Sequence, residues 1–317
     1  MSLFKLARPL NLAIMVLTMV CLRYWIIASI MQSANIGMEF QLSEIQFTLL
    51  CCVVVLLAAA GNFINDYFDL KVDRINRPDR VIIGKDVKRR VAMILHQVLN
   101  IIAVLLTAYL CWKTQLWGGM IFTVVIATLL WWYSPILKKR AVIGNIVIAI
   151  CAGLVPIWQA YFEINLLEVR YHQMLLSEDL IQSMWYWMIG YGFFAFILTL
   201  AREILKDIED IEGDKTEHYH TLPINTSESF ARYTATIILW VSLLAFLCVI
   251  SYYYMHDTNT LIAAALLVVL PLVIGIKGSG SARKKEEYHR ASMWVKAAMV
   301  GGILFAYFAG QHLAQLS

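Results

Sequence analysis

The sequence contains few charged residues for its length. Only 15% of its 317 residues are Asp, Glu, Lys or Arg, whereas 60% are hydrophobic and the mean hydropathy is +0.68. A soluble globular domain carries roughly 25% charged residues, so this composition excludes one. No linker or low-complexity tail divides the chain. We therefore expect a single membrane-embedded domain over residues 1–317.

The chain also lacks the residue patterns of transition-metal and nucleotide sites. Its six cysteines stand in apolar runs without metal-ligand spacing, and its seven histidines are scattered. We interpret the cysteines as small buried hydrophobic residues rather than as disulfides or metal ligands. The glycines of residues 275–285, GIKGSGSARKK, indicate a loop and do not form a phosphate-binding signature before a helix. We expect no nucleic-acid partner.

Long apolar runs are present instead. A helix needs about 20 apolar residues to cross a bilayer. The sequence holds nine such runs, at residues 10–31, 45–65, 91–112, 116–133, 141–162, 185–205, 232–254, 259–276 and 293–314. The first follows Lys5 and Arg8, as in a signal peptide, but it exceeds the roughly 7–15 residues of a signal h-region. We predict an all-α integral membrane protein with nine transmembrane helices.

Lys and Arg are unevenly divided between the loops. They gather in every second one, namely 66–90, 138–140, 202–215 and 277–290. The intervening loops hold almost none: 32–44 and 252–258 have no Lys or Arg, and 163–184 has only Arg170. By the positive-inside rule the basic loops are cytoplasmic. We predict a multi-pass protein of the cell (plasma) membrane with its N-terminus in the cytoplasm and its C-terminus outside.

Two aspartate triplets of identical spacing contain six of the ten aspartates. They are Asp66, Asp69 and Asp73 in NDYFDLKVD, and Asp207, Asp210 and Asp214 in KDIEDIEGD, and equivalent positions lie 141 residues apart. Steps of three and four place each triplet on one face of a helix. Both triplets follow apolar runs at the predicted cytoplasmic side. Carboxylates so close repel one another. Divalent cations that also bind a polyphosphate would offset this repulsion and explain why the sequence contains both triplets.

The residues around the triplets favour a hard metal ion. Asn62 and Asn65 precede Asp66 and Asp69 by four residues each, which extends a face rich in oxygen and free of His or Cys. Oxygen ligands select Mg²⁺ or Mn²⁺, and Mg²⁺ is commonly shared between carboxylates and substrate phosphates. The alternative interpretation is that these carboxylates are solvated or paired with nearby Lys and Arg.

Basic side chains near the triplets are candidates for contacting a diphosphate, whose departure needs cations to stabilise the developing charge. The candidates are Arg8, Arg77, Lys138 and Lys206. The alternative is topogenic charge that faces lipid headgroups. Arg202 also precedes the second triplet.

Aromatic residues matter if a carbocation forms, because aromatic faces stabilise cations. Tyr133 and Tyr191 are candidates for this role. The neighbouring Trp131 and Trp132 fit an interfacial belt better.

These motifs resemble those of the UbiA-type intramembrane prenyltransferases. NDYFDLKVDRINRPDR is similar to the first signature of that family, N-D-x-x-D-x-x-x-D, and REILKDIEDIEGDKTEHYHTLPI is similar to the second. The opening RPLNL, the segment YSPILKKR and the pair Gly144–Asn145 also match. The resemblance covers the whole chain. It implies nine helices with a cytoplasmic-side active site, and metal and diphosphate contacts at Asn65, Asp66, Asp69, Asp73, Asp207, Asp210 and Asp214. Arg77 and Lys138 match basic positions that contact the diphosphate.

The resemblance also implies a reaction. Mg²⁺ would hold an isoprenyl diphosphate whose tail lies among the helices, the diphosphate would depart, and a lipophilic acceptor would capture the allylic cation. REILKDIEDIEGD and TLPI are most similar to the digeranylgeranylglyceryl phosphate synthases, so geranylgeranylglyceryl phosphate or a similar prenylglycerol phosphate is the expected acceptor. That branch usually continues NRP-x-RP-I-P-S-G, whereas Val81 follows Arg80 here. Prenylation of an aromatic or quinone precursor therefore stays open.

Two other classes of membrane protein are weaker alternatives. A cation-coupled transporter would carry its acidic site near the bilayer midplane on broken helices, whereas both triplets follow the ends of predicted spans. A CDP-alcohol phosphotransferase would carry a single acidic signature containing Ala-Arg and glycines, which this sequence lacks.

Overall fold

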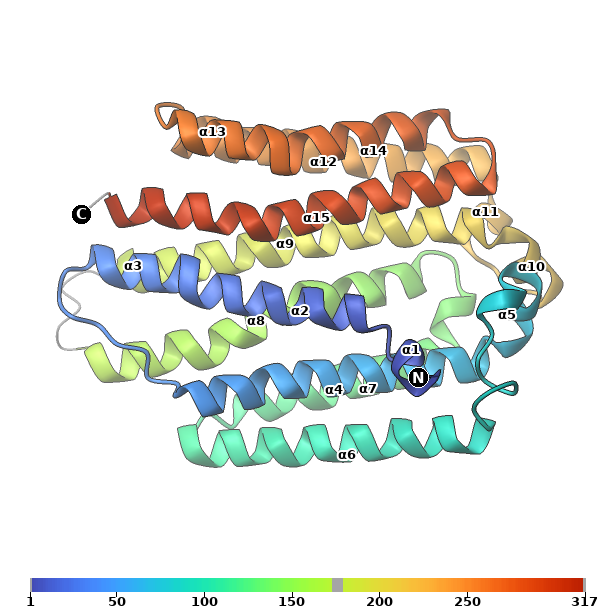
Figure 1. Cartoon of the computed structure of the whole chain (residues 1–317), viewed down its shortest axis with the longest axis horizontal. Coiled ribbons are helices and arrows are strands. Elements are labelled where there is room, and N and C mark those ends of the chain that lie inside the picture. The colour runs from blue at the N-terminus through green and yellow to red at the C-terminus, as the bar shows by residue number, and fades with distance from the viewer. Residues whose placement is uncertain (1, 173–178, 316–317) are drawn as a thin grey trace.

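The computed structural model describes residues 2–172 and 179–315, and every regular element within them is a helix (Figure 1). The predicted all-α class is thus confirmed. Eight helices or helix runs in the described ranges are long and apolar enough to cross a membrane. They are α2–η1–α3 (Pro9–Ser33), α4 (Glu44–Phe68), α6 (Arg89–Thr114), α8 (Ile143–Tyr171), α9 (Asp179–Glu209), α12 (Glu228–Tyr253), α13–η4–α14 (Thr258–Ser281) and α15 (Lys285–Gln315).

The span predicted at residues 116–133 corresponds to a shorter helix. Helix α7 (Gly118–Tyr133) has 16 residues, or about 24 Å at roughly 1.5 Å per residue. This is less than the approximately 30 Å of a bilayer hydrocarbon core. It packs between α4, α6 and α8, and so belongs to the bundle.

Two predicted loops are largely helical. The prediction of a loop over residues 163–184 was wrong for most of that range, because α8 continues to Tyr171 and α9 begins at Asp179. Residues 173–178 lie outside the described ranges. Glu163 had marked the end of the predicted span, but its charge is buried against Arg23, and both side chains are 0% exposed. Paired in this way, the carboxylate lies inside the bundle without ending the helix. The glycine-rich segment is also no loop up to Ser281, where α14 ends.

The cysteines are only partly as predicted. Cys21, Cys51 and Cys111 are buried in the core, whereas Cys52 and Cys248 are exposed on the outer surface. In a membrane protein the outward side of a helix is apolar as well, so an apolar run does not distinguish the two faces.

The long helices lie side by side along one direction, and α9 packs against both α8 and α15 (Figure 1). The short helices α5 (Leu70–Asn76) and α10 (Ile211–Thr216) lie together at one end, and the described chain reaches its last residues at the opposite end (Figure 1). Each of these two short helices contains the last aspartate of one triplet, so the fold brings both motifs to the same end of the bundle.

Helix α15 packs closely against two π-helical segments. These are η1 (Leu22–Ile27) and η4 (Ala265–Val269), where one carbonyl in each bulges toward α15. Gly310 lies against the carbonyl oxygen of Trp25, and Gly301 lies against that of Leu267. A β-carbon at either glycine would overlap the carbonyl, so the π segments and the glycines require one another.

Gly310→Ala is expected to lower the midpoint of thermal unfolding in detergent, because overpacking a close helix contact typically costs about 1–3 kcal/mol. Gly302→Ala is the matched control on the same helix, since a β-carbon there meets nothing within 4 Å. The control should leave the midpoint unchanged or raise it slightly. Equal midpoints for the two variants would contradict this account of the packing.

Candidate active site

The first aspartate triplet crosses a joint between two helices. Helix α4 ends just before Asp69, and α5 begins just after it. The backbone hydrogen bonds nevertheless continue, from Asp69 N to Asn65 O at 2.9 Å, from Asp73 N to Asp69 O at 2.8 Å, and from Arg77 N to Asp73 O at 2.8 Å. Because this ladder is unbroken, Asn65, Asp69, Asp73 and Arg77 stay on one face, and all four line the same cavity.

The second triplet is constructed in the same way. Helix α9 ends just before Asp210, and α10 begins just after it. Asp210 N bonds to Lys206 O at 2.9 Å, and Asp214 N bonds to Asp210 O at 3.2 Å. In both motifs the middle aspartate is therefore the joint residue between a long helix and a short one.

A hydrogen-bonded clamp joins the two motifs. The Asn76 side chain on α5 donates to the Asp210 carbonyl at 2.9 Å and accepts from the Gly213 amide at 2.9 Å. A β-carbon at Gly213 would lie 2.5 Å from Asn76 Nδ2, so a glycine is required for this approach. Sequence reasoning missed both residues. The only signal was that each lies one to three residues from a motif aspartate.

Four of the six aspartates have side-chain partners from other parts of the chain. These are Asp66 with Arg8 at 2.6 Å, Asp69 with Lys138, Asp207 with Asn145 at 2.9 Å, and Asp210 with Arg77 at 2.9 Å. Three of the four predicted basic residues are thus brought to the triplets. The fourth, Lys206, contacts Glu203 at 2.5 Å instead.

The turn between α7 and α8 brings two of these partners to the triplets. Gly144 allows the turn to approach α8, because a β-carbon there would lie 2.8 Å from the Lys138 backbone. Val142 has a positive φ of 63°, which is a rare conformation for a β-branched residue. This strained turn orients Lys138 toward Asp69 and Asn145 toward Asp207. The sequence pair Gly144–Asn145 therefore has a geometric role.

The two motifs face a cavity of about 790 Å³. Asn65, Asp69, Asp73, Asp207 and Asp210 line its polar end. Asp66 and Asp214 do not line it: Asp66 holds Arg8, and Asp214 is only 3% exposed.

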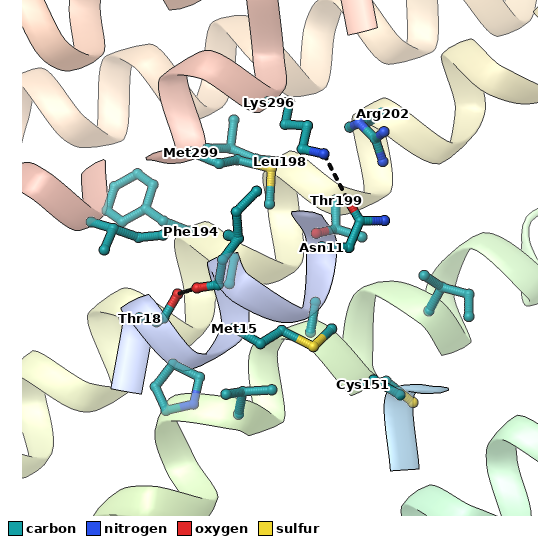
Figure 2. A pocket seen from close by; sticks show the side chains of 18 of the residues that line it. Asn11, Met15, Thr18, Cys151, Phe194, Leu198, Thr199, Arg202, Lys296 and Met299 are labelled. Carbon is teal, nitrogen blue, oxygen red and sulfur yellow. Dashed lines mark hydrogen bonds between the residues drawn. The ribbon is translucent and has the colours of Figure 1, made fainter. Parts of the chain in front are cut away.

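The rest of the cavity wall is largely apolar. Figure 2 shows Met15, Phe194, Leu198 and Met299 along this part. On α9 the lining extends from Ser183 to Asp210, or about 40 Å along the helix. The cavity therefore combines a charged end with a long apolar channel.

The two candidate tyrosines lie at different depths. Tyr133 lines the polar end, close enough to the charges of Lys138, Asp69 and Asp207 to interact with them. Tyr191 also lines the cavity but precedes Asp207 by 16 residues on α9, which is about 24 Å along the axis. A role for Tyr191 at a carbon beside the diphosphate does not fit this position. Trp131 and Trp132 are exposed on the outer surface.

The acidic residues at this end are short of positive charge. Burial raises the pKa of Asp73 to about 6 and that of Asp214 to about 7, and it also raises the pKa of Asp210. Burial alone would lower the pKa of Lys138, but the charges of Asp69, Tyr133 and Asp214 and the hydrogen bond to Asp69 together outweigh it and raise the pKa well above its ordinary value. An additional cation at this end would therefore stabilise the ionised carboxylates.

The oxygen atoms available fit Mg²⁺. Asn65 Oδ1 and Asp69 Oδ1 are buried without a hydrogen-bond partner among the described residues, while the other oxygen of Asp69 pairs with Lys138. In the described part of the chain, no three His, Cys, Asp or Glu side chains form a metal site by themselves. Mg²⁺ commonly takes only one or two protein carboxylates and completes its coordination with water and substrate phosphate.

The fold and the cavity define an integral multi-pass membrane protein whose charged site opens onto a long apolar channel. The chain belongs to the UbiA prenyltransferase family, whose family model matches residues 24–300, and it is a prenyltransferase. It is 32% identical over 272 residues to the digeranylgeranylglyceryl phosphate synthase of Methanosphaera stadtmanae, covering 84% of this chain and 87% of that one.

Solved structures share the fold. One is described as a digeranylgeranylglyceryl phosphate synthase in membranes, with a TM-score of 0.60, 22% identity, and coverage of 97% of this chain and 98% of that one. Another is a UbiA homolog from Archaeoglobus fulgidus bound to DMAPP and Mg²⁺, with a TM-score of 0.56, 14% identity and full coverage of both chains.

Gly213→Ala is expected to reduce prenyl transfer at least tenfold, because the added methyl group separates α10 from Asn76 and shifts Asp210 and Asp214. Transfer is measured by mass spectrometry of the prenylated product, and folding is checked by thermal unfolding. Gly280→Ala is the control, since a β-carbon there meets only Thr236 at 3.9 Å. Full activity in Gly213→Ala would show that the clamp is not needed.

Proposed function

We propose that this protein transfers the prenyl group of an isoprenyl diphosphate, best matched by geranylgeranyl diphosphate, to the free hydroxyl of geranylgeranylglyceryl phosphate. The C–O bond to the diphosphate breaks, an ether bond forms, and diphosphate and one proton are released. The observation that carries this proposal is the continuity of the cavity from the paired motifs into the apolar channel. The relatives named digeranylgeranylglyceryl phosphate synthase support the choice of acceptor.

The proposed metal and diphosphate ligands are those whose side chains reach the cavity: Asn65, Asp69, Asp73, Asp207 and Asp210. Bound Mg²⁺, or Mn²⁺ in its place, would neutralise the diphosphate and make it a better leaving group. The UbiA homolog of Archaeoglobus fulgidus, which binds DMAPP or GPP together with Mg²⁺, supports this assignment. Asp66 and Asp214 do not line the cavity but contribute negative charge close to it, and Asp66 also orients Arg8.

The basic residues are proposed to hold the leaving group. Lys138 forms an ion pair with an aspartate of the first triplet, and Arg77 forms one with an aspartate of the second. Both side chains line the cavity, so they can contact the diphosphate beside either motif. Arg8 lines the same end. Lys206, by contrast, pairs with Glu203 and lies toward the inside of the cavity. Fixed cations at this place stabilise the charge that develops as the C–O bond breaks. Tyr133, which lines the polar end of the cavity, is proposed to stabilise the allylic cation.

The membrane arrangement is part of the proposal. We assign α7 as the ninth span, since it packs among the spanning helices despite its 16 residues. The basic loops lie at the end that holds α5 and α10, which supports a cytoplasmic active site and a cytoplasmic N-terminus. The C-terminal end of α15 would then lie on the outer side of the plasma membrane.

Asp69→Asn and Asp210→Asn are each expected to lower kcat/KM at least a hundredfold, because each removes a charge that the proposed metal site needs while keeping the side-chain shape. Initial rates of diphosphate release measure the loss. Glu212→Gln is the matched control, since Glu212 lies on α10 between Asp210 and Asp214 but is exposed. Near-normal rates in both Asn variants would refute the assignment.

Wild-type protein supplied with geranylgeranyl diphosphate and Mg²⁺ should prenylate geranylgeranylglyceryl phosphate, as seen by mass spectrometry. Removal of the metal with EDTA should abolish the product, and added Mg²⁺ or Mn²⁺ should restore it. Parallel reactions with 4-hydroxybenzoate, homogentisate and a naphthoate should give little product. Preferential prenylation of an aromatic acceptor would replace the proposed acceptor but leave the reaction class intact.

A further inference from the structure

A second charged group lines the cavity deeper than the aspartate triplets. It consists of Asn11 on α2, Arg202 and Lys206 on α9, and Lys296 on α15, and is called the inner basic cluster below. Figure 2 shows Asn11, Arg202 and Lys296 converging from three helices on the same part of the cavity. Because three separate helices contribute, the cluster depends on tertiary packing, and no sequence motif indicates it.

The inner basic cluster carries more positive charge than its surroundings balance. Glu203 is shared by Lys206 at 2.5 Å and by Arg202 at 3.4 Å. Lys296 Nζ donates to the neutral Asn11 Oδ1 at 2.6 Å, and no ion pair involves Lys296 in the described ranges. Within residues 2–172 and 179–315, Arg202 Nε is buried without a hydrogen-bond partner, and Lys296 lies close enough to Arg202 for the two charges to repel.

This excess points to an anionic ligand. Three cations and one carboxylate leave about two net positive charges in a largely apolar cavity, and unbalanced charge in such a place is unfavourable. A phosphate monoester carries about −1.5 to −2 charges near pH 7 and has three acceptor oxygens. Its charge matches the excess, and its oxygens match the donors of two lysines and an arginine.

The cluster and the second triplet occupy one face of α9. Arg202, Lys206 and Asp210 are separated by four residues each, so the face changes from basic to acidic toward the α10 end. Arg202 lies about 12 Å along the axis from Asp210. Leu198 and Met299 adjoin the cluster on its apolar side (Figure 2). The cavity thus has an outer site suited to metal and diphosphate and an inner site suited to an anion with an apolar tail.

We propose that the inner basic cluster binds the phosphate of the acceptor lipid, an inference that rests on the proposed function. In a prenylglycerol phosphate the free hydroxyl and the phosphate are on adjacent glycerol carbons. A phosphate held by Lys296 and Arg202 therefore keeps the hydroxyl within a few bond lengths, on the side that faces the outer site. The acceptor tail then lies against Leu198 and Met299. The cluster selects acceptors that carry a phosphate.

The same phosphate chemistry also occurs in the donor, so the experiment separates the two substrates. Purified full-length protein is assayed with each substrate varied in turn while the other is saturating. Lys296→Met should raise the KM for geranylgeranylglyceryl phosphate roughly tenfold or more, because a charged hydrogen bond is lost. The KM for geranylgeranyl diphosphate should change less than about twofold. Lys296→Arg should restore most of the acceptor affinity.

A dephosphorylated acceptor provides the second readout. Wild type should use geranylgeranylglycerol poorly, and Lys296→Met should use it as well as wild type does, so that the preference for the phosphorylated acceptor collapses. Arg202→Gln should shift the preference in the same direction, so a folding defect in one variant does not decide the outcome. Lys113→Met is the control, because Lys113 is exposed at the end of α6 and does not line the cavity.

An unchanged acceptor KM in folded Lys296→Met and Arg202→Gln would overturn the inference, as would a rise confined to the donor KM. Either result leaves the proposed function standing, since wild type still makes the product. If wild type uses no prenylglycerol phosphate at all, the proposed function fails and the inference fails with it.

Discussion

The repulsion between six carboxylates at one end of an apolar bundle is the constraint on which the rest of the structure depends. Buried negative charges are tolerated only when cations or donors face them. Arg8, Lys138, Arg77 and Asn145 each come from a different part of the chain to meet one aspartate. These contacts draw the N-terminal segment, the turn before α8, and the short helices α5 and α10 into one place. The architecture of that end therefore follows from charge compensation as much as from apolar packing.

The two motifs are alike in construction but differ in their supports. Each has its middle aspartate at a joint that leaves the hydrogen-bond ladder continuous. A lysine from a strained turn meets Asp69, whereas Asp210 meets an arginine of the other motif. The first motif thus supplies a counter-charge to the second, next to the clamp of Asn76 and Gly213. Because one oxygen of Asp69 has no hydrogen-bond partner in the described part of the chain, this compensation is incomplete, and an incomplete site is suited to accept a metal and an anion together.

Much of the fold could be predicted because apolar length and helical spacing are local properties. The all-α class and the side chains that share a face within each triplet follow from them. The convergence of Asn76 with Gly213, and of Lys296 with Asn11, could not be predicted, since it depends on how distant helices pack. The position of Tyr191 could not be predicted either. An aromatic side chain is suited to stabilise a cation, but the distance of Tyr191 from the aspartates depends on the three-dimensional path of the cavity along α9. The continuation of α8 through Glu163 depended on Arg23, 140 residues earlier in the chain.

The pairing of Asp69 with Lys138 has a consequence for the order in which the protein is made. Lys138 follows Asp69 by 69 residues, whereas the second triplet follows the first by 141. At roughly 5–20 residues per second, translation leaves the first triplet without the second for roughly 7–30 s. Lys138 is synthesised about halfway through this interval, so the nascent chain carries its own counter-ion for Asp69 before α10 exists. The lysine that serves the finished site is thus available to Asp69 before the second triplet has been made.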